Sequence, residues 1–352
     1  MNTTIIRNGR VIDPANKRDE VVDLAIIEGR IAEKAEGGRQ HAEIEEIDAS
    51  GLIVAPGLID MHVHLREPGF SHKETIESGA RAAAAGGFTT IVCMPNTLPV
   101  ADTASTIAWI KGRATAVAGV NILPSGAISK NLAGEELAPI GSLAQAGVVA
   151  ITDDGRCIQN HEVMRRAVEY ARMVGLPVLD HCQDYNLVGG GVVNEGYWST
   201  LLGLPGWPAA GEAAIVMRNI LLAELCDHHI HCQHVSCAAS VRLIREARAR
   251  GIKISGEVCP HHIALTDEAI QNFDTNYKTN PPLRSQADVD ALLEGIADRT
   301  LSILASDHAP HADFERKWSL MQRLLGSSDS KPNWEFSSIG SCINIARSTS
   351  CD

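Results

Sequence analysis

The spacing of apolar and polar residues divides the chain into two parts. Up to about residue 55, short alternating runs predict strands that are separated by turn residues such as Asn8-Gly9, Glu28-Gly29 and Gly37-Gly38. The strands are expected at residues 4–7, 22–27, 30–32, 43–48 and 52–54. This part is therefore predicted to be a small β module over residues 1–55.

From Gly57 onward, apolar strand patterns alternate with amphipathic helical patterns, which is typical of parallel βα units. Helices are expected at residues 73–85, 161–174 and 239–250, each followed by glycine. Eight strand patterns occur, at residues 58–65, 89–94, 120–124, 148–152, 177–181, 229–235, 253–258 and 301–306. Eight βα repeats in about 250 residues predict an α/β fold of the TIM (β/α)8 barrel type, which we place at residues 56–315.

Charge and composition exclude several classes of protein. The net charge of -12, with no basic stripe, argues against a nucleic-acid or anionic-membrane surface. No apolar run approaches the roughly 18 residues of a membrane span, and no basic, cleavable leader opens the chain. The nine cysteines form no C-x-x-C pair and are expected to be buried, reduced thiols. We expect a cytoplasmic protein that binds neither nucleic acid nor membrane.

The segment at residues 60–69 carries the first candidate chemistry. Alternate side chains of a strand share a face, so His62 and His64 can offer two imidazoles to one divalent metal at the end of the first barrel strand. Active sites of such barrels gather at the carboxyl ends of the strands. The other strand ends carry further candidate ligands, namely Asp153 and Asp154, His181, His234 and Asp307.

A single His-x-His, or a lone His181 or His234, is more often structural than a metal ligand. Their joint placement at matched strand ends favours a metal site. Four imidazoles and two carboxylates exceed the needs of one tetrahedral ion and suit two metals that share a carboxylate. Asp307 can also shuttle a proton during hydrolysis.

Two segments, residues 60–69 and 305–311, resemble the two signatures of dihydroorotase, a cyclic-amide hydrolase of the amidohydrolase superfamily. The resemblance extends to about Glu315 and includes residues 93–97, 152–155, 181–184 and 278–284. Aspartate in place of the carboxylated lysine of many relatives implies the class I, long-chain bacterial type. The resemblance implies one or two zinc ions, with Asp154 bridging, held by His62, His64, Asp154, His181, His234 and Asp307.

The same resemblance implies a substrate site. Arg66, Asn96 and His311 would hold the carboxylate of dihydroorotate, and Asn280 the ring amide. A guanidinium can bind a carboxylate through two parallel hydrogen bonds, although Arg66 can alternatively pair with Glu67. The implied reaction is the reversible hydrolysis of dihydroorotate to N-carbamoyl-L-aspartate in de novo pyrimidine (UMP) biosynthesis, with Asp307 moving the proton and with no organic cofactor.

Two other interpretations stay open. One is a different cyclic amidase, such as an allantoinase or hydantoinase, against which the presence of Arg66 argues. The other is an inactive homologue that partners aspartate transcarbamoylase, against which the full set of six ligands argues. A homodimer and an association with aspartate transcarbamoylase are also implied.

Residues 316–352 depart from the resemblance. They contain nine serines and lack helical or strand periodicity. Back-translation of residues 318–329, read one frame over, can give E-F-D-A-A-P-F-G-I-I-G-L, which resembles the dihydroorotase sequence at this point. We therefore interpret the tail as a reading-frame change that removes the last barrel helix and the C-terminal strands of the β module. Poor solubility and little activity are expected; the alternative is a divergent tail that packs as a helix over residues 318–326.

Overall fold

The computed structural model describes residues 3–32, 44–117 and 119–316, and its contacts form two compact units, one up to Leu58 and one from Ile59 onward. The expectations for Gly37-Gly38 and for residues beyond Arg316 lie outside the described residues. In the described ranges, no helix combines the length and apolar character needed to cross a membrane.

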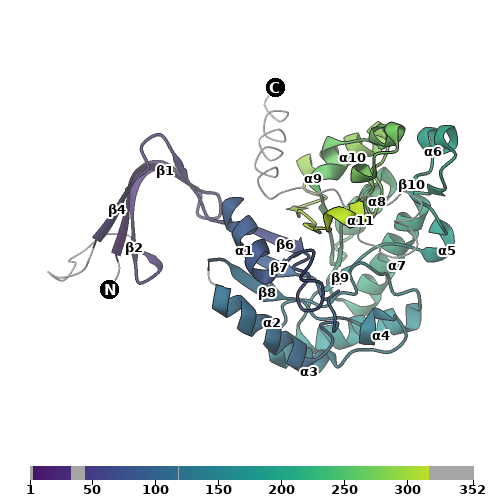
Figure 1. The fold of residues 1–352 in the computed structure, drawn as a ribbon, viewed down its shortest axis with the longest axis horizontal. Helices are drawn as coiled ribbons and strands as arrows, with labels where there is room; N and C mark the ends of the chain where they lie inside the picture. The colour runs from purple at the N-terminus through teal and green to yellow at the C-terminus, as the bar shows by residue number, and fades with distance from the viewer. Residues whose placement is uncertain (1–2, 33–43, 118, 317–352) are drawn as a thin grey trace. The chain divides into compact units, whose positions relative to one another are not determined.

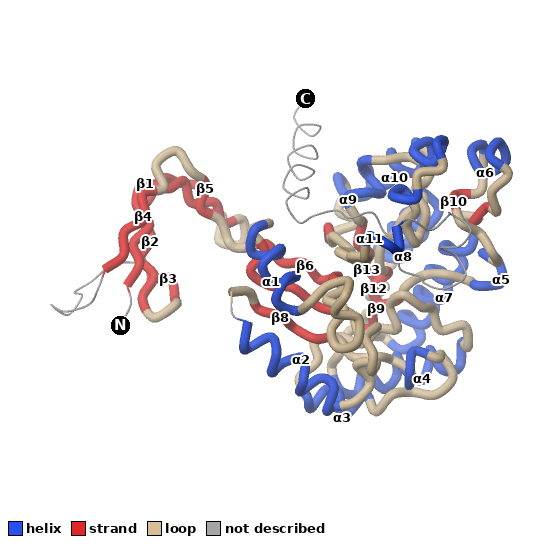
Figure 2. Tube along the Cα trace, viewed as in Figure 1, coloured by secondary structure: helices blue, strands red, loops and turns tan. Residues whose placement is uncertain are grey.

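The first unit is a five-stranded sheet in the order β3-β2-β1-β4, with β5 also paired to β1 (Figures 1 and 2). Its strands are β1 (Thr3–Asp13), β2 (Arg18–Ile27), β3 (Arg30–Ala32), β4 (Ile44–Asp48) and β5 (Ile53–Val54). The prediction of a turn at Asn8-Gly9 is wrong, because β1 continues through these two residues, with a shift in its register against β2. Asn8 takes a left-handed backbone with φ 60°, and a Cβ on Gly9 would lie 2.5 Å from Val54 Cγ2, so the two residues form a bulge inside one long strand.

The second unit is the predicted barrel. Strands β6 (Leu58–Val63), β7 (Phe88–Cys93) and β8 (Asn121–Pro124) form one sheet, and β9 (Val178–Asp180), β12 (Ile230–Cys232), β13 (Ile254–Val258) and β14 (Ile303–Leu304) form another. The fourth expected strand is reduced to Ile151, which bridges Gly126 on one side and Val178 on the other. A last bridge, between Val63 and His308, closes the ring.

Helices surround these strands (Figure 2). The longer ones are α1 (Ile76–Ala85), α2 (Ala104–Val117), α3 (Ile140–Ala146), α4 (His161–Val174), α7 (Ala210–Cys226), α8 (Ala238–Ala249) and α10 (Gln286–Ala297). The shorter elements are α5 (Tyr185–Val188), α6 (Tyr197–Leu202), α9 (Pro260–Ala264), α11 (Asp313–Arg316), the strands β10 (Val193–Asn194) and β11 (Gly206–Trp207), and the 3-10 turns Lys130–Leu132, Asp267–Asn272 and Thr275–Tyr277.

The ends of α4 show why local sequence predicts this helix well. Asn160 accepts hydrogen bonds from the N–H groups of Glu162 and Val163, and Gly175 ends the helix with φ 73°. Helix α1 begins three residues later than expected, because Thr75 caps it together with Ser78. Fully buried side chains from successive strands fill the interior between sheet and helices, among them Ile91, Ile151, Val178, Ile230 and Val258.

Candidate metal centre

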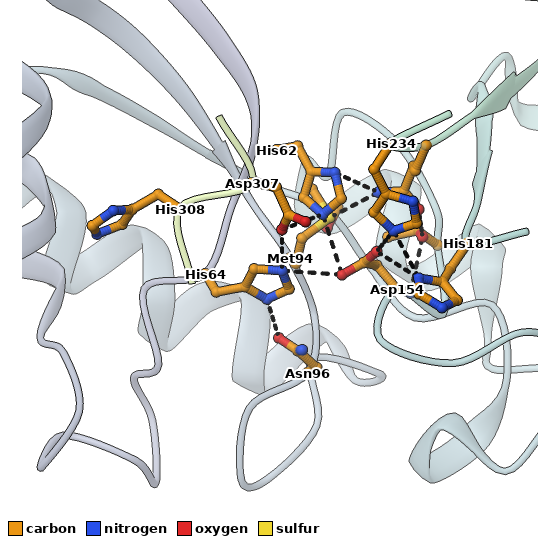
Figure 3. Close-up of polar contacts among 12 residues, drawn as sticks. His62, His64, Met94, Asn96, Asp154, His181, His234, Asp307 and His308 are labelled. Carbon is orange, nitrogen blue, oxygen red and sulfur yellow. Dashed lines mark hydrogen bonds and ion pairs between the residues drawn. The ribbon is translucent and has the colours of Figure 1, made fainter. Parts of the chain in front are cut away.

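The carboxyl ends of the barrel strands bring all six expected ligands together (Figure 3). Each is at most 2 % exposed. They come from β6 or directly after it, from the loop behind Ile151, and from the ends of β9, β12 and β14. The ligands are His62, His64, Asp154, His181, His234 and Asp307.

The carboxylate of Asp154 lies between two pairs of imidazoles. Its Oδ2 is 3.3 Å from His62 Nε2 and 3.1 Å from His64 Nε2. Its Oδ1 is 3.7 Å from His181 Nδ1 and 3.5 Å from His234 Nε2. Asp154 therefore belongs to two groups of ligand atoms, which we call the first donor group (His62, His64, Asp154) and the second donor group (Asp154, His181, His234).

Asp307 faces the first donor group. Its Oδ1 is 3.3 Å from His62 Nε2 and 3.2 Å from His64 Nε2. Its backbone is left-handed, with φ 51°, and the same is true of His234, with φ 33°. Such conformations are uncommon outside glycine and carry strain that the surrounding structure must support.

The charges within this cluster stabilise one another. Burial alone would raise the pKa of Asp154, but positive charge on His62 and the nearby ring nitrogens of His181 and His234, 3.7 and 3.5 Å from Oδ1, hold it well below its usual range. Burial alone would lower the pKa of His62, but the carboxylates of Asp307, Asp154 and Glu257 raise it well above its usual value. The site thus keeps the buried Asp154 carboxylate ionised.

The residues present fit divalent metal ions. Both carboxylate oxygens of Asp154 are buried and make no hydrogen bond of good geometry with the described residues. A buried carboxylate without hydrogen bonds is costly, and metal coordination removes that cost. Imidazole nitrogens and carboxylate oxygens are the donors that zinc and related ions use.

Comparison with known proteins identifies the family. A family model described as Dihydro-orotase-like matches residues 51–240. The dihydroorotase of Pelotomaculum thermopropionicum is 53% identical over 312 residues, which cover 89% of this chain and 73% of that protein. The dihydroorotase of Syntrophotalea carbinolica is 50% identical over 322 residues, or 92% and 76% of the two chains. The chain belongs to the dihydroorotase family.

Solved structures with a similar fold are hydantoinases. The L-hydantoinase (dihydropyrimidinase) from Arthrobacter aurescens superposes with a TM-score of 0.77 at 22% identity, covering 94% of this chain and 73% of that one. A D-hydantoinase superposes with a TM-score of 0.76 at 25% identity, covering 95% and 74%. These likenesses confirm the TIM barrel and the amidohydrolase superfamily.

In this member of the dihydroorotase family, side-chain oxygens of residues outside the ligand set contact the second ring nitrogen of three of the histidines. Asn96 Oδ1 is 2.9 Å from His64 Nδ1, Gln183 Oε1 is 2.9 Å from His181 Nε2, and Glu257 Oε1 is 2.5 Å from His62 Nδ1. Such outer partners fix ring orientation in metal sites. Reasoning from the sequence missed Gln183 and Glu257; the signal for Glu257 was a carboxylate inside the apolar run of β13, where a charge needs a partner.

Of the residues expected to bind substrate, Asn96 contacts the centre directly, through His64 Nδ1. Arg66 is 2 % exposed, has φ 63°, and donates from Nε to Pro310 O at 3.2 Å. Asn96 Nδ2 is buried with no hydrogen-bond partner in the described ranges, so it can donate to a bound molecule. His311 Nδ1 lies 3.2 Å from Glu315 Oε2. Glu67 uses its carboxylate at the start of α1, where it accepts the Ile76 N–H at 2.8 Å.

Two neighbouring residues stay outside the centre. Asp153, a candidate ligand in the sequence, instead accepts the backbone N–H groups of Ile128 and Ser129. His308 turns away from the ligands, as Figure 3 shows, and lies 2.6 Å from Glu74 Oε2.

Proposed function

We propose that this chain is a zinc-dependent dihydroorotase, a cyclic amidohydrolase that interconverts dihydroorotate and N-carbamoyl-L-aspartate in pyrimidine biosynthesis. The observation that carries the proposal is the Asp154 carboxylate, with one oxygen toward each histidine pair, in a chain about half identical to proteins named dihydroorotase.

We assign the metal to the two donor groups, with Asp154 shared between them and Asp307 facing the first. Because there are two such groups, we propose that the site binds two zinc ions. A metal bound there supplies a nucleophilic water at neutral pH and polarises the amide carbonyl of the substrate. The Asp307 carboxylate accepts the proton of the attacking water and returns it to the leaving ring nitrogen. Its Oδ1 lies 3.2 Å from His64 Nε2, within the first donor group's surroundings, which supports this role.

We assign substrate orientation to Arg66, Asn96, His311 and Asn280. The buried guanidinium of Arg66 and the partly unused amide of Asn96 offer donors for the ring carboxylate. Asn280 would hold the ring amide. A carboxylate held by Arg66 favours dihydroorotate over hydantoin or allantoin, which lack that group.

We further propose a cytoplasmic homodimer, with the chemistry confined to the barrel of residues 56–315 and none in the β module of residues 1–55. The seven cysteines of the described ranges are all buried free thiols, which suits a reducing compartment. Met217, Leu221 and Leu225 form an exposed apolar stripe at i, i+4 and i+8 along α7, which supports contact with a second copy. We also propose that the chain associates with aspartate transcarbamoylase.

A substrate panel tests this function. The zinc-loaded protein is mixed separately with dihydroorotate, hydantoin, dihydrouracil and allantoin, and loss of ring absorbance is followed. Dihydroorotate should be turned over fastest. Faster turnover of an uncharged ring would refute the substrate assignment, and no turnover by zinc-replete, folded protein would favour the inactive homologue.

A further inference from the structure

Glu257 lies on β13, contacts two of the expected metal ligands and is fully buried. Its Oε1 is 2.5 Å from His62 Nδ1 and accepts the backbone N–H of His234 at 3.1 Å. One oxygen of a residue outside both donor groups therefore contacts a member of each. This inference rests on the metal-binding part of the proposed function.

The contact with His62 fixes which of its nitrogens faces the centre. An ionised carboxylate can only accept, so the proton of a neutral His62 ring lies on Nδ1. The lone pair is then on Nε2, which points at Asp154 and Asp307 at 3.3 Å each. Because His62 is fully buried, water cannot take over this orienting role.

The contact with His234 supports a strained backbone. With φ 33°, His234 lies in the left-handed region that non-glycine residues seldom adopt. Its N–H is directed to Glu257, while its Nε2 reaches the other side of the centre, 3.5 Å from Asp154 Oδ1. Holding this N–H keeps the imidazole of the second donor group in place.

A second layer orients Glu257 itself. Its Oε2 lies 3.1 Å from His231 Nε2, and His231 Nδ1 lies 2.8 Å from Ser255 Oγ. Ser255 Oγ in turn lies 2.9 Å from His229 Nε2. His231 is 1 % exposed, so the contact that orients Glu257 lies in the barrel interior, whereas Ser255 is half-buried and His229 lies at the surface.

We propose that Glu257 is a positioning residue that ties the two donor groups together, so that both metals depend on one carboxylate that binds neither. If Glu257 oriented only one ligand, its removal would lower metal affinity at one donor group alone. This coupling predicts a loss of metal affinity that extends to the group of His181 and His234, although the Glu257 side chain contacts a ligand ring at His62, in the first donor group.

Metal titration tests the proposal without using turnover. Wild type, Glu257→Leu and Glu257→Gln are stripped by chelation and titrated with Co2+, with the visible spectrum and a competing chromophoric chelator reporting stoichiometry and affinity. Glu257→Leu should weaken binding at both donor groups by about 10- to 100-fold. Glu257→Gln should weaken both by less, because its amide oxygen still accepts from His62 and its amide nitrogen can donate to His231.

Two matched controls separate coupling from general damage. Glu212→Gln changes another buried glutamate, which accepts the Ser236 N–H at 3.1 Å, and should leave Co2+ affinity close to wild type. Gln183→Ala removes the partner of His181 Nε2 and should weaken the second donor group alone. Far-UV circular dichroism checks folding.

Wild-type affinity at both groups in Glu257→Leu, or a loss confined to the first group, would overturn the proposal. So would an equal loss in Glu212→Gln. If Glu257→Leu does not fold, Glu257→Gln decides by the same criterion, with a several-fold loss expected at both groups. Failure of the wild type to hydrolyse dihydroorotate would refute the substrate and leave this result standing, since metal binding is read separately.

Discussion

The β module and the barrel mouth both hold carboxylates against cationic side chains, at similar distances but in opposite surroundings. In the module, Arg10 Nε lies 2.7 Å from Asp19, and both side chains are 54% exposed. At the mouth, His62 Nε2 lies 3.3 Å from Asp154, and both are fully buried. Water screens the first pair and is excluded from the second, so the charges of the second pair interact more strongly, and its buried carboxylate is the one suited to hold a metal.

Among the substitutions in the buried cluster, Asp154→Ala should have the largest effect. It removes the ligand shared by both donor groups, so zinc should be lost from both, and turnover of dihydroorotate should fall by at least about 10³-fold. Metal analysis after dialysis, together with initial rates, measures the effect. Retention of two zinc ions would contradict the shared role.

Asp307→Asn should separate chemistry from metal binding. The amide cannot accept the proton of the attacking water, so kcat should fall by about 10²- to 10⁴-fold. Zinc content should fall much less than in Asp154→Ala, because Asp307 faces only the first donor group. A parallel loss of zinc and turnover would show that Asp307 is a ligand without a proton-transfer role.

Arg66→Met should lower kcat/KM for dihydroorotate by roughly 100-fold, which is about 3 kcal/mol for a charged hydrogen-bond pair. Zinc content and the thermal midpoint should stay near wild type, which metal analysis and calorimetry can check. An unchanged kcat/KM would show that the ring carboxylate is bound elsewhere.

Asp180→Ala extends the comparison to a buried pair outside the metal centre. Asp180 Oδ2 lies 2.6 Å from Arg218 Nη2 and also accepts from Asn219 Nδ2 at 2.7 Å. Removing one partner of a buried pair leaves the other uncompensated, so the free energy of unfolding should fall by about 3–5 kcal/mol. Urea denaturation measures the loss. A fall in the free energy of unfolding no larger than that of a surface substitution would show that burial does not make this pair more important than an exposed one.

Arg10→Gln should have the smallest effect. Arg10 makes two contacts to Asp19, at 2.7 and 2.8 Å, yet the pair is open to solvent and screened by salt. The thermal midpoint should be indistinguishable from wild type at physiological salt. A clear drop would mean that exposure alone does not set the importance of these pairs.

The sequence allowed the barrel and the positions of the ligands to be predicted, because both depend on local or periodic signals. Asn160 and Gly175 mark the ends of α4, and strand ends carry His62, His181 and Asp307. The ligand roles themselves remain predictions until metal is measured. The pairing of the fourth strand could not be predicted, because it depends on how Ile151 meets strands distant in sequence.

Partners that act at a distance were also beyond the sequence. Asn96 was expected only at the substrate, yet its Oδ1 lies beside His64 Nδ1. Glu257 and His62 are 195 residues apart, and no local pattern brings them together. Periodicity predicts which way a side chain points, whereas the closed barrel decides which side chains meet.

The left-handed backbones at Arg66 and His234 bear on the evolutionary history of related chains. Glycine and asparagine adopt this conformation at lower cost than arginine or histidine. A lineage released from selection for turnover therefore gains stability by drifting toward glycine or asparagine at these two positions. Among homologues, the residues found there should distinguish chains still selected as catalysts from chains retained for other reasons.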